Sequence, residues 1–355
     1  MNLKLFRFSL ICAFFLIAGA FPKSAFSQEG TSASKEKKFV PKDVILEHIG
    51  DSHSWPVLGK TTLPLPVILY TDKGLELFSS DKIKEEEVNG EPKGKIYQGA
   101  HYTYTAEKDK IKVVDANGNI DEAASKKVFD FSITRNVVSM FMALAILLIV
   151  FLNISSSYKK RVGKAPKGLQ SFLEPLIVFV RDDIAIPNMG SKYARFMPLL
   201  LTIFFFILIN NLLGMIPFFP GGYNLTGNIA VTATLSVIIL FVVNLNGNKY
   251  YWKHIFLPDV PFWILPIMWI VEIVGIFSKP IALMIRLFAN ITAGHIVILS
   301  LISLIFIFKT LWVSPVSIGF VVFMDVIEVL VAFLQAYIFT LLSSLFIGMA
   351  IEEHH

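Results

Sequence analysis

Seven polar side chains interrupt the most apolar half of this sequence, where they could hold or move ions. They are Glu272, Lys279, Arg286, Asn290, His295, Glu328 and Gln335. Ionisable groups at membrane depth are costly, and in membrane proteins they usually mark an ion path or a partner charge. As a set, these residues therefore predict a function in ion translocation.

Spacing divides three of these residues between two faces of a helix. Asn290 follows Arg286 by four residues, so the two share one face. His295 follows Arg286 by nine residues, which places it on the opposite face at about 100° per residue. One face therefore presents a cation and an amide, and the other presents a titratable imidazole.

The residue types indicate what each face can do. Arginine stays charged at any relevant pH, so Arg286 can attract and discharge a carboxylate but cannot relay a proton by releasing one. Histidine and glutamate both change protonation state, so His295 and Glu328 suit a proton relay. Asp325, Glu328 and Gln335 fall along one stripe of the last apolar run. A fixed cation beside a titratable pair is typical of an ion-translocating machine.

Each residue taken alone also has a purely structural interpretation. A charge near a helix end can snorkel to water, and a polar pair can hold two helices together. Snorkelling is favoured for Lys279, which one helical turn or a kink would bring to water. The structural interpretation is weaker for the four ionisable residues that fall within two adjacent apolar runs, namely Glu272, Arg286, His295 and Glu328.

Long apolar helices must position these residues. The 355-residue chain is 54% hydrophobic, so several membrane spans are expected. Apolar runs occur near 136–153, 197–218, 229–245, 262–278, 280–308 and 312–350. Residues 280–308 alone would form a helix of about 44 Å, against a hydrocarbon core of roughly 30 Å. Either the last runs break into more spans, or two very long helices cross tilted and bent, with a kink at Pro280.

Two independent signals orient the chain. Residues 1–27 are typical of a cleaved signal peptide, with an uncleaved anchor helix as the alternative. Eight of the 14 Lys and Arg residues of the segment 131–355 lie between Lys159 and Arg195, which makes this loop cytoplasmic by the positive-inside rule. Both signals place residue 130 outside. The C-terminus is cytoplasmic if residues 262–308 cross once, and outside if they cross twice.

Residues 28–130 are predicted to form a small, β-leaning extracytoplasmic module. They carry 15 Lys and Arg and 18 Asp and Glu residues, against 14 and 9 in the longer segment 131–355. The sequence KIKVVDANGNI, residues 110–120, indicates a strand and a turn, whereas DKIKEEEVNGEPKGK, residues 81–95, is typical of a solvated charged loop. A disordered start is expected near residues 28–38.

Metal and thiol chemistry find little support in the sequence. His48 and His53 are better explained as exposed or packed histidines, because no cysteine or acidic cluster completes a metal site. Cys12 is the only cysteine and lies in the predicted signal peptide. Between the first two apolar runs, apolar residues at helical spacing over 169–180 predict an amphipathic helix on the membrane surface.

Three stretches resemble subunit a of the rotary F-type ATP synthases. SKPIALMIRLFANITAGHIVIL, residues 278–299, resembles the family signature Arg-Leu-Phe-x-Asn with Ala-Gly further on. LQAYIFTLLSSLFIGMAIEEHH, residues 334–355, resembles the family C-terminus, and LTIFFFILINNLLGMIPF, residues 201–218, resembles an earlier helix. The resemblance covers about 131–355, and residues 184–207 resemble the Bacteroidetes-type branch.

The resemblance implies a stator subunit without an active site of its own, beside a rotating ring of c subunits. It implies an all-α polytopic membrane protein of about five crossing helices, two of them long, tilted and paired as a hairpin against the c-ring. The implied location is the cell inner membrane, with a cytoplasmic C-terminus. The implied partners are the c-ring, b-type peripheral stalk subunits and membrane lipid, with no nucleic acid, cofactor or metal.

The resemblance also implies residue roles. Arg286 is similar to the stator arginine, which draws the ring carboxylate into its ionised form and blocks leakage between two proton half-channels. Asn290 resembles the family asparagine one turn later, and Gln335 resembles the glutamine that faces the arginine from the last helix.

The remaining implied roles concern the two half-channels. His295 and Glu328 resemble the titratable pair of the outer half-channel, with their identities exchanged relative to some relatives. Glu272 resembles the acid of the inner half-channel. The resemblance does not explain residues 28–130, and it fixes neither the coupling ion nor the size of the ring.

Two other function classes fit the buried charges less well. A secondary transporter or channel would be favoured by inverted repeats, and none is evident. An intramembrane enzyme could use His295 and Glu328 as acid and base, but the sequence offers no nucleophile elbow, phosphate loop or sufficient set of metal ligands. Copurification with a c-ring would distinguish the stator hypothesis from both of these alternatives.

Overall fold

The computed structural model describes residues 50–352, apart from 59–60, 89–90, 108–109, 116–118, 217–220, 224, 259, 262 and 309–312. These described residues fall within one unit, Val40–His355. The predicted signal peptide, the segment near 28–38 and His48 lie outside the described residues.

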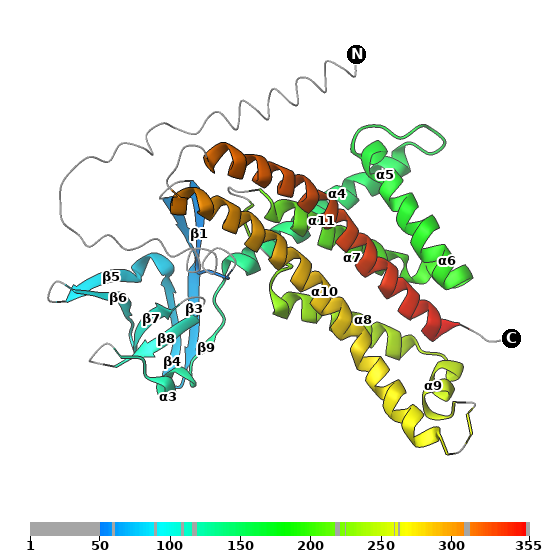
Figure 1. The fold of residues 1–355 in the computed structure, drawn as a ribbon, viewed down its shortest axis with the longest axis horizontal. Coiled ribbons are helices and arrows are strands. Elements are labelled where there is room, and N and C mark those ends of the chain that lie inside the picture. The colour runs from blue at the N-terminus through cyan, green and yellow to red at the C-terminus, as the bar shows by residue number, and fades with distance from the viewer. Residues whose placement is uncertain are drawn as a thin grey trace, which may run out of the picture. The chain divides into compact units, whose positions relative to one another are not determined.

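The first part of the described chain is rich in strands (Figure 1). The strands are β1 (Ser54–Leu58), β2 (Thr61–Pro64), β3 (Pro66–Thr71), β4 (Gly74–Ser79), β5 (Lys84–Val88), β6 (Glu91–Gln98), β7 (Thr103–Glu107), β8 (Lys110–Val114) and β9 (Phe129–Asp130). They form a β1-β2 pair, a β4-β3-β9 sheet and a β5-β6-β7-β8 sheet, all antiparallel. We call residues 50–130 the β-module. The β-leaning prediction for this region is confirmed.

One local prediction for the β-module is wrong. The charged stretch 81–95 was expected to be a loop, but it contains β5 and the start of β6, which pair as a hairpin. The sequence of β5, KEEEV, lacks an apolar alternation that would signal a strand. Backbone hydrogen bonds to β6 stabilise β5 instead, and β6 is itself held on its other side by β7.

Alternation of side chains builds the interior of the β-module. Val67 and Leu69 of β3 and Ile111 and Val113 of β8 are two residues apart in their strands, so each pair points to one side. All four are buried in one cluster with Tyr104 of β7. These contacts give the β-module an apolar core separate from that of the helices.

Helices make up most of the remaining chain. The longer ones are α4 (Arg135–Lys160), α5 (Leu169–Phe179), α7 (Tyr193–Gly214), α8 (Ile229–Asn246), α9 (Lys249–Phe256), α10 (Leu265–Phe308) and α11 (Val313–Ile351). Short elements are the 3-10 turn Ser80–Lys82, α3 (Glu122–Ser125), the π-helical stretch Val180–Ala185, α6 (Ile186–Met189) and the 3-10 turn Gly190–Lys192. The helix predicted over 169–180 is α5, and its location on the membrane surface stays a prediction.

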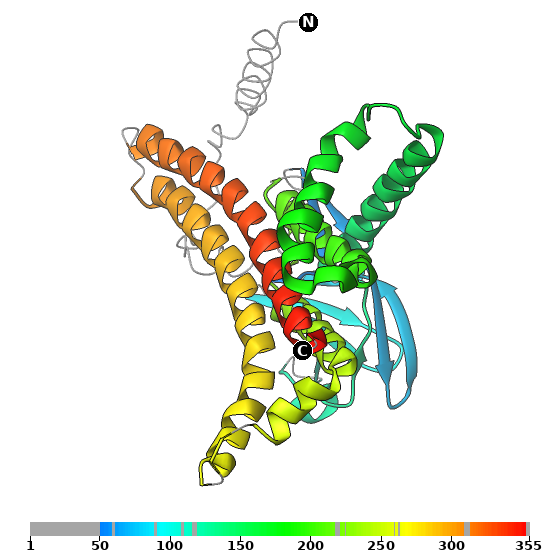
Figure 2. The same cartoon turned by 90° about the vertical axis from the view of Figure 1, so that its right-hand side faces the viewer.

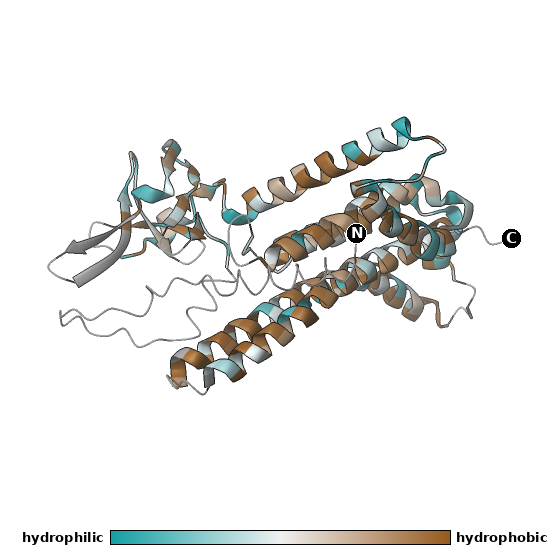
Figure 3. Cartoon of the chain, turned by 90° about the horizontal axis from the view of Figure 1, so that it is seen from above, coloured by the Kyte–Doolittle hydropathy of each residue, from teal (hydrophilic) through white to brown (hydrophobic). Residues whose placement is uncertain are grey.

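Five segments of the described chain are long and apolar enough to cross a membrane, and Figure 3 shows their apolar colouring. They are Arg135–Lys160, Leu169–Gly214, Ile229–Asn246, Leu265–Ile305 and Ser314–Ile351. The last apolar runs do not break into additional spans, because α10 is one helix of 44 residues and α11 one of 39. At about 1.5 Å per residue, α10 is roughly 66 Å long and continues through Pro280. The predicted polytopic α-helical fold is confirmed.

The two long helices lie side by side over much of their length (Figures 1 and 2). Small residues let α11 approach its neighbours, since Ala336, Ser343, Ser344 and Ala350 are fully buried. A methyl group on Gly348 would collide with the carbonyl oxygen of Asn188, so the backbones of α11 and α6 approach closely there. Close packing of this kind fixes α11 against α6.

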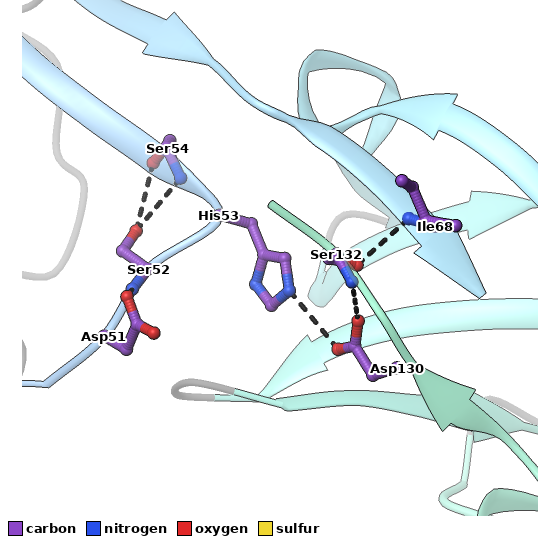
Figure 4. A network of polar contacts seen from close by, with 7 residues as sticks. All are labelled: Asp51, Ser52, His53, Ser54, Ile68, Asp130 and Ser132. Atoms are coloured by element: carbon purple, nitrogen blue, oxygen red, sulfur yellow. Dashed lines mark hydrogen bonds and ion pairs between the residues drawn. The ribbon is translucent and has the colours of Figure 1, made fainter. Parts of the chain in front are cut away.

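A polar network joins β1, β3 and β9 just before α4 begins (Figure 4). The Nε2 atom of the buried His53 lies 3.4 Å from Oδ2 of Asp130. The other carboxylate oxygen of Asp130 accepts a 2.8 Å hydrogen bond from the backbone N–H of Ser132, whose hydroxyl accepts one from Ile68 N–H. His53 is thus a packed histidine, as predicted.

The same segment reaches the first turn of α4. The guanidinium of Arg135 donates a 2.6 Å hydrogen bond to the carbonyl of Gly50. The backbone N–H of Arg135 donates a 2.8 Å hydrogen bond to the carbonyl of Ser52. The backbone N–H of Asn136 donates to Oδ1 of Asp51 at 3.1 Å, placing an acid where the helix dipole favours it. The residues just before β1 are therefore fastened to the start of the first long helix.

Asp130 makes this junction sensitive to acid. Burial by itself would raise the pKa of Asp130, but hydrogen bonds from His53 and Ser132 outweigh it and hold the pKa below its ordinary value. A carboxylate with a lowered folded-state pKa stabilises the fold above its unfolded pKa of about 3.9. That contribution is lost as the pH falls through the lower, folded-state value.

We predict that Asp130→Asn lowers the stability of the protein at pH 7 by about 1–2 kcal/mol, because charge-assisted hydrogen bonds are lost at a partly exposed site. The deficit should shrink as the pH approaches 3. Thermal unfolding of the full-length protein in detergent measures both effects. Asp81→Asn, an exposed carboxylate, is the control. An equal deficit at both pH values would contradict the assignment.

Candidate functional site

The structure brings His295 of α10 and Glu328 of α11 into direct contact. Nδ1 of His295 lies 2.6 Å from Oε1 of Glu328. The two side chains are 15% and 7% exposed, so they face each other between the helices. An ionised Glu328 accepts a hydrogen bond from an Nδ1–H of His295 at this distance. The predicted titratable pair is therefore one hydrogen-bonded unit.

Glycines keep space open around this pair. A methyl group on Gly294 would lie 2.9 Å from Oε1 of Glu328, so the carboxylate occupies the space beside that glycine. A methyl group on Gly214, the last residue of α7, would lie 3.9 Å from Nε2 of His295 and 2.7 Å from the carbonyl oxygen of Tyr223. The second ring nitrogen of His295 thus faces the end of α7.

Arg286 and Asn290 lie on a different side of α10, where both are exposed. Their shared face agrees with the four-residue spacing. Within the described part of the chain, the structure gives Arg286 no hydrogen bond and no ion pair. Arg286 lies 21 residues after Leu265 and 22 before Phe308. That is roughly 30 Å of helix on either side, so snorkelling from a helix end does not explain it.

Small residues border the arginine along the same face. Ala282, Ala289 and Ala293 lie three to seven residues from Arg286, and all three are exposed. Small side chains let the backbone of a second helix come near. The face therefore combines one permanent cation, one amide and little steric bulk.

Glu272 lies nearer the start of α10 and is half-buried. Its Oε1 is 3.7 Å from Nδ1 of His254 on α9, a contact that becomes an ion pair when the histidine is protonated. Lys279 extends over the ring of Phe346 on α11, with Nζ 5.5 Å from the ring centroid. Lys279 thus has a structural contact and stays outside the proposed site.

The last helix places its polar residues unequally. Gln335 is buried at 4% exposure, whereas Asp325 is exposed. In the described residues no hydrogen bond joins Gln335 to Arg286, so the implied pairing of these two residues stays a prediction. The structure does not bring all six candidate residues into one cluster.

Sequence reasoning missed a second polar group, formed by α7 and the residues that follow it. Thr226 donates a 2.6 Å hydrogen bond to Oδ1 of Asn211, and the hydroxyl of Tyr223 lies 3.5 Å from Oδ1 of Asn210. Asn210 and Asn211 are buried in α7. Two adjacent asparagines in an apolar run were the available signal. His254 was also missed, because its partner Glu272 is 18 residues away in sequence.

Metal binding has no structural support among the described residues, which contain no group of three His, Cys, Asp or Glu side chains able to hold an ion. Along the described part of α10, Glu272 and His295 each form a histidine–carboxylate contact, whereas Arg286 has neither a hydrogen bond nor an ion pair. The histidine and carboxylate side chains can take up and release protons, whereas the arginine stays charged.

Known proteins resemble this chain in two parts. Residues 137–348 match the family described as ATP synthase A chain. Residues 44–131 match a family described as a domain of unknown function, DUF8433.

Individual relatives agree with the first match. An ATP synthase subunit a from Chloroherpeton thalassium is 51% identical over 233 residues, covering 64% of this chain and 69% of the relative. An ATP synthase subunit a 2 from Prosthecochloris aestuarii is 49% identical over 230 residues, covering 62% and 69%. An ATP synthase subunit a from an Anaeromyxobacter species is 40% identical over 258 residues, covering 69% and 62%.

Proposed function

The chain belongs to the ATP synthase A chain family, and from this premise we propose how its residues move protons. It is a non-catalytic, multi-pass subunit of the membrane sector with a role in proton translocation. We propose that Arg286 meets the ionisable carboxylate of a rotating c-ring, and that two half-channels lead to that contact from opposite sides.

The observation that carries the proposal is the state of Arg286. A guanidinium that stays charged lies near the middle of a 44-residue apolar helix, exposed and without a partner among the described residues. A cation at membrane depth requires a counter-charge. A carboxylate delivered by another subunit satisfies this need, and the small residues Ala282, Ala289 and Ala293 leave room for its helix.

The histidine–carboxylate contacts supply the two proton paths. His295 and Glu328 accept a proton in the outer half-channel and pass it to the ring carboxylate. After nearly a full turn the ring carboxylate approaches Arg286, which favours its ionised form. The proton then leaves near Glu272 and His254 in the inner half-channel. Asn290 and Gln335 orient the arginine and shield it from direct exchange between the paths.

Sidedness and partners follow the same proposal. Residues 1–27 are a signal peptide, residues 28–130 form an extracytoplasmic module, and residues 131–355 form the membrane domain with a cytoplasmic C-terminus. The protein is located in the cell inner membrane. The c-ring contacts α10 and α11, and b-type peripheral stalk subunits hold the chain against rotation.

We predict that Arg286→Ala abolishes ATP-driven proton pumping in inverted vesicles while the complex still assembles, because the ring carboxylate is no longer ionised at the stator. Passive proton leak should rise several-fold once the catalytic head is removed, since the barrier between the half-channels is lost. Lys279→Ala, a cation seven residues away on the same helix, is the control and should pump normally. Normal pumping by Arg286→Ala would overturn the proposal.

We predict that Gly294→Ala reduces proton flux several-fold without loss of assembly. The added methyl group would lie 2.9 Å from Oε1 of Glu328, so the carboxylate must move and its 2.6 Å contact with His295 breaks. Stability should change little, because the atom that moves ends a flexible side chain. Gly275→Ala makes the same change on α10 in open space and is the matched control. Equal flux in both variants would argue against a paired relay.

We predict that a cysteine at Ala100 reacts with an impermeant maleimide in intact spheroplasts, whereas one at Lys164 reacts only after lysis. Both substitutions are made with Cys12→Ser, so each chain carries one thiol. Mass spectrometry of the labelled chain provides the readout. Reaction of Lys164→Cys before lysis would reverse the proposed orientation.

A further inference from the structure

Trp55 of β1 is packed onto the segment that joins α7 to α8. Its side chain is 1% exposed. The indole Nε1–H donates a 3.2 Å hydrogen bond to the carbonyl of Gly221, and its ring meets the ring of Tyr223 edge to face, with centroids 5.8 Å apart. Trp55, Tyr223 and Leu225 form one buried cluster against residues of α4 and α7. A residue of the β-module thus fixes a segment of the membrane domain.

Gly221, which Trp55 contacts, and the next residue, Gly222, have closely constrained backbones. A methyl group on Gly221 would lie 2.5 Å from the carbonyl oxygen of Leu213, so the backbone is pressed against the end of α7. Gly222 has a φ of 71°, a conformation that other residues rarely adopt. Trp55 therefore contacts backbone that itself lies against the end of α7.

Tyr223 connects this contact to His295 through the end of α7. The carbonyl oxygen of Tyr223 lies against Gly214, and Gly214 in turn faces Nε2 of His295. Thr226 secures the buried Asn211 of α7 from the same segment. Tyr223 and Thr226 therefore contact the end of α7, which faces the ring nitrogen of His295 that does not contact Glu328.

The residues that precede Trp55 in the chain are also fixed in place. The chain just before it is bonded to the start of α4 through Arg135 and Asn136, which contact Gly50, Ser52 and Asp51. Trp55 therefore sits between two anchors, the first turn of α4 and the end of α7. This arrangement resists displacement better than a single contact could.

We propose that the β-module is a brace for proton uptake, and that Trp55 is its positioning residue. Through Gly221 and Tyr223, Trp55 sets the end of α7 against the His295 side of the His295–Glu328 pair. This inference rests on the proposed role of that pair. It assigns the β-module a function that the ATP synthase A chain match, which begins at residue 137, does not cover.

A thiol probe tests the brace independently of proton flux. Leu225 is 1% exposed and lies in the Trp55 cluster, so Leu225→Cys in a Cys12→Ser background reports opening of the segment. In the purified complex, Trp55→Ala should raise the maleimide reaction rate of this cysteine several-fold. Trp55→Phe keeps a ring but loses the N–H donor, and it should give a smaller increase.

Phe78→Ala is the matched control. Phe78 is buried in the separate core of the β-module, so its loss weakens the module and leaves the cluster of Trp55, Tyr223 and Leu225 in place. The labelling rate of Leu225→Cys should stay near the parental value. An equal rise in Phe78→Ala and Trp55→Ala would mean that general loosening of the module is responsible, and would overturn the role of Trp55.

Proton flux in vesicles stripped of the catalytic head provides the functional readout. Trp55→Ala should reduce the flux several-fold and displace the pH at half-maximal flux, because the surroundings of His295 change while its titratable neighbours Glu328 and Asp325 remain. Phe78→Ala should keep the parental pH profile. A faster thiol reaction with unchanged flux and profile would refute the brace. If His295→Ala itself left flux unchanged, the proposed relay would fail instead, and the thiol result would still stand.

Discussion

The cost of placing charge in an apolar medium governs the polar residues of this protein. A buried ionisable group must be neutralised, paired or brought to water. Glu328 and Glu272 each meet a histidine, whose charge can appear or disappear with that of the carboxylate. Arg286 has no such option because its charge is permanent. The two glutamates therefore find their partners within the chain, whereas Arg286 needs a counter-charge from another subunit.

Helix length turns this chemistry into a path. Glu272, Arg286 and His295 lie on one unbroken helix, about 21 Å and about 14 Å apart along its axis. A helix that crossed upright within roughly 30 Å could not hold all three at separate depths within the hydrocarbon core. The length of α10 and its pairing with α11 therefore keep the two histidine–carboxylate contacts apart, with the arginine between them.

Local spacing predicted the parts of the site that depend on one helix. Residues four apart had to share a face, and Arg286 and Asn290 do. The contact between His295 and Glu328 required a resemblance, since its members come from two helices. The contact of Glu272 with His254 was not predicted, because it depends on where α9 lies. The β5 strand was missed for a related reason: its partner strands form it, and its own side chains give no signal.

The contact of Trp55 with Gly221 lies furthest from any sequence pattern, because 166 residues separate the two. Its energetic logic is nevertheless simple. An indole buried at 1% exposure needs an acceptor for its N–H, and the carbonyl of Gly221, beside the end of α7, provides one. One hydrogen bond therefore satisfies a residue of the β-module and a backbone group of the membrane domain together. A module added before the first long helix can in this way influence a titratable pair without contributing a charged group to it.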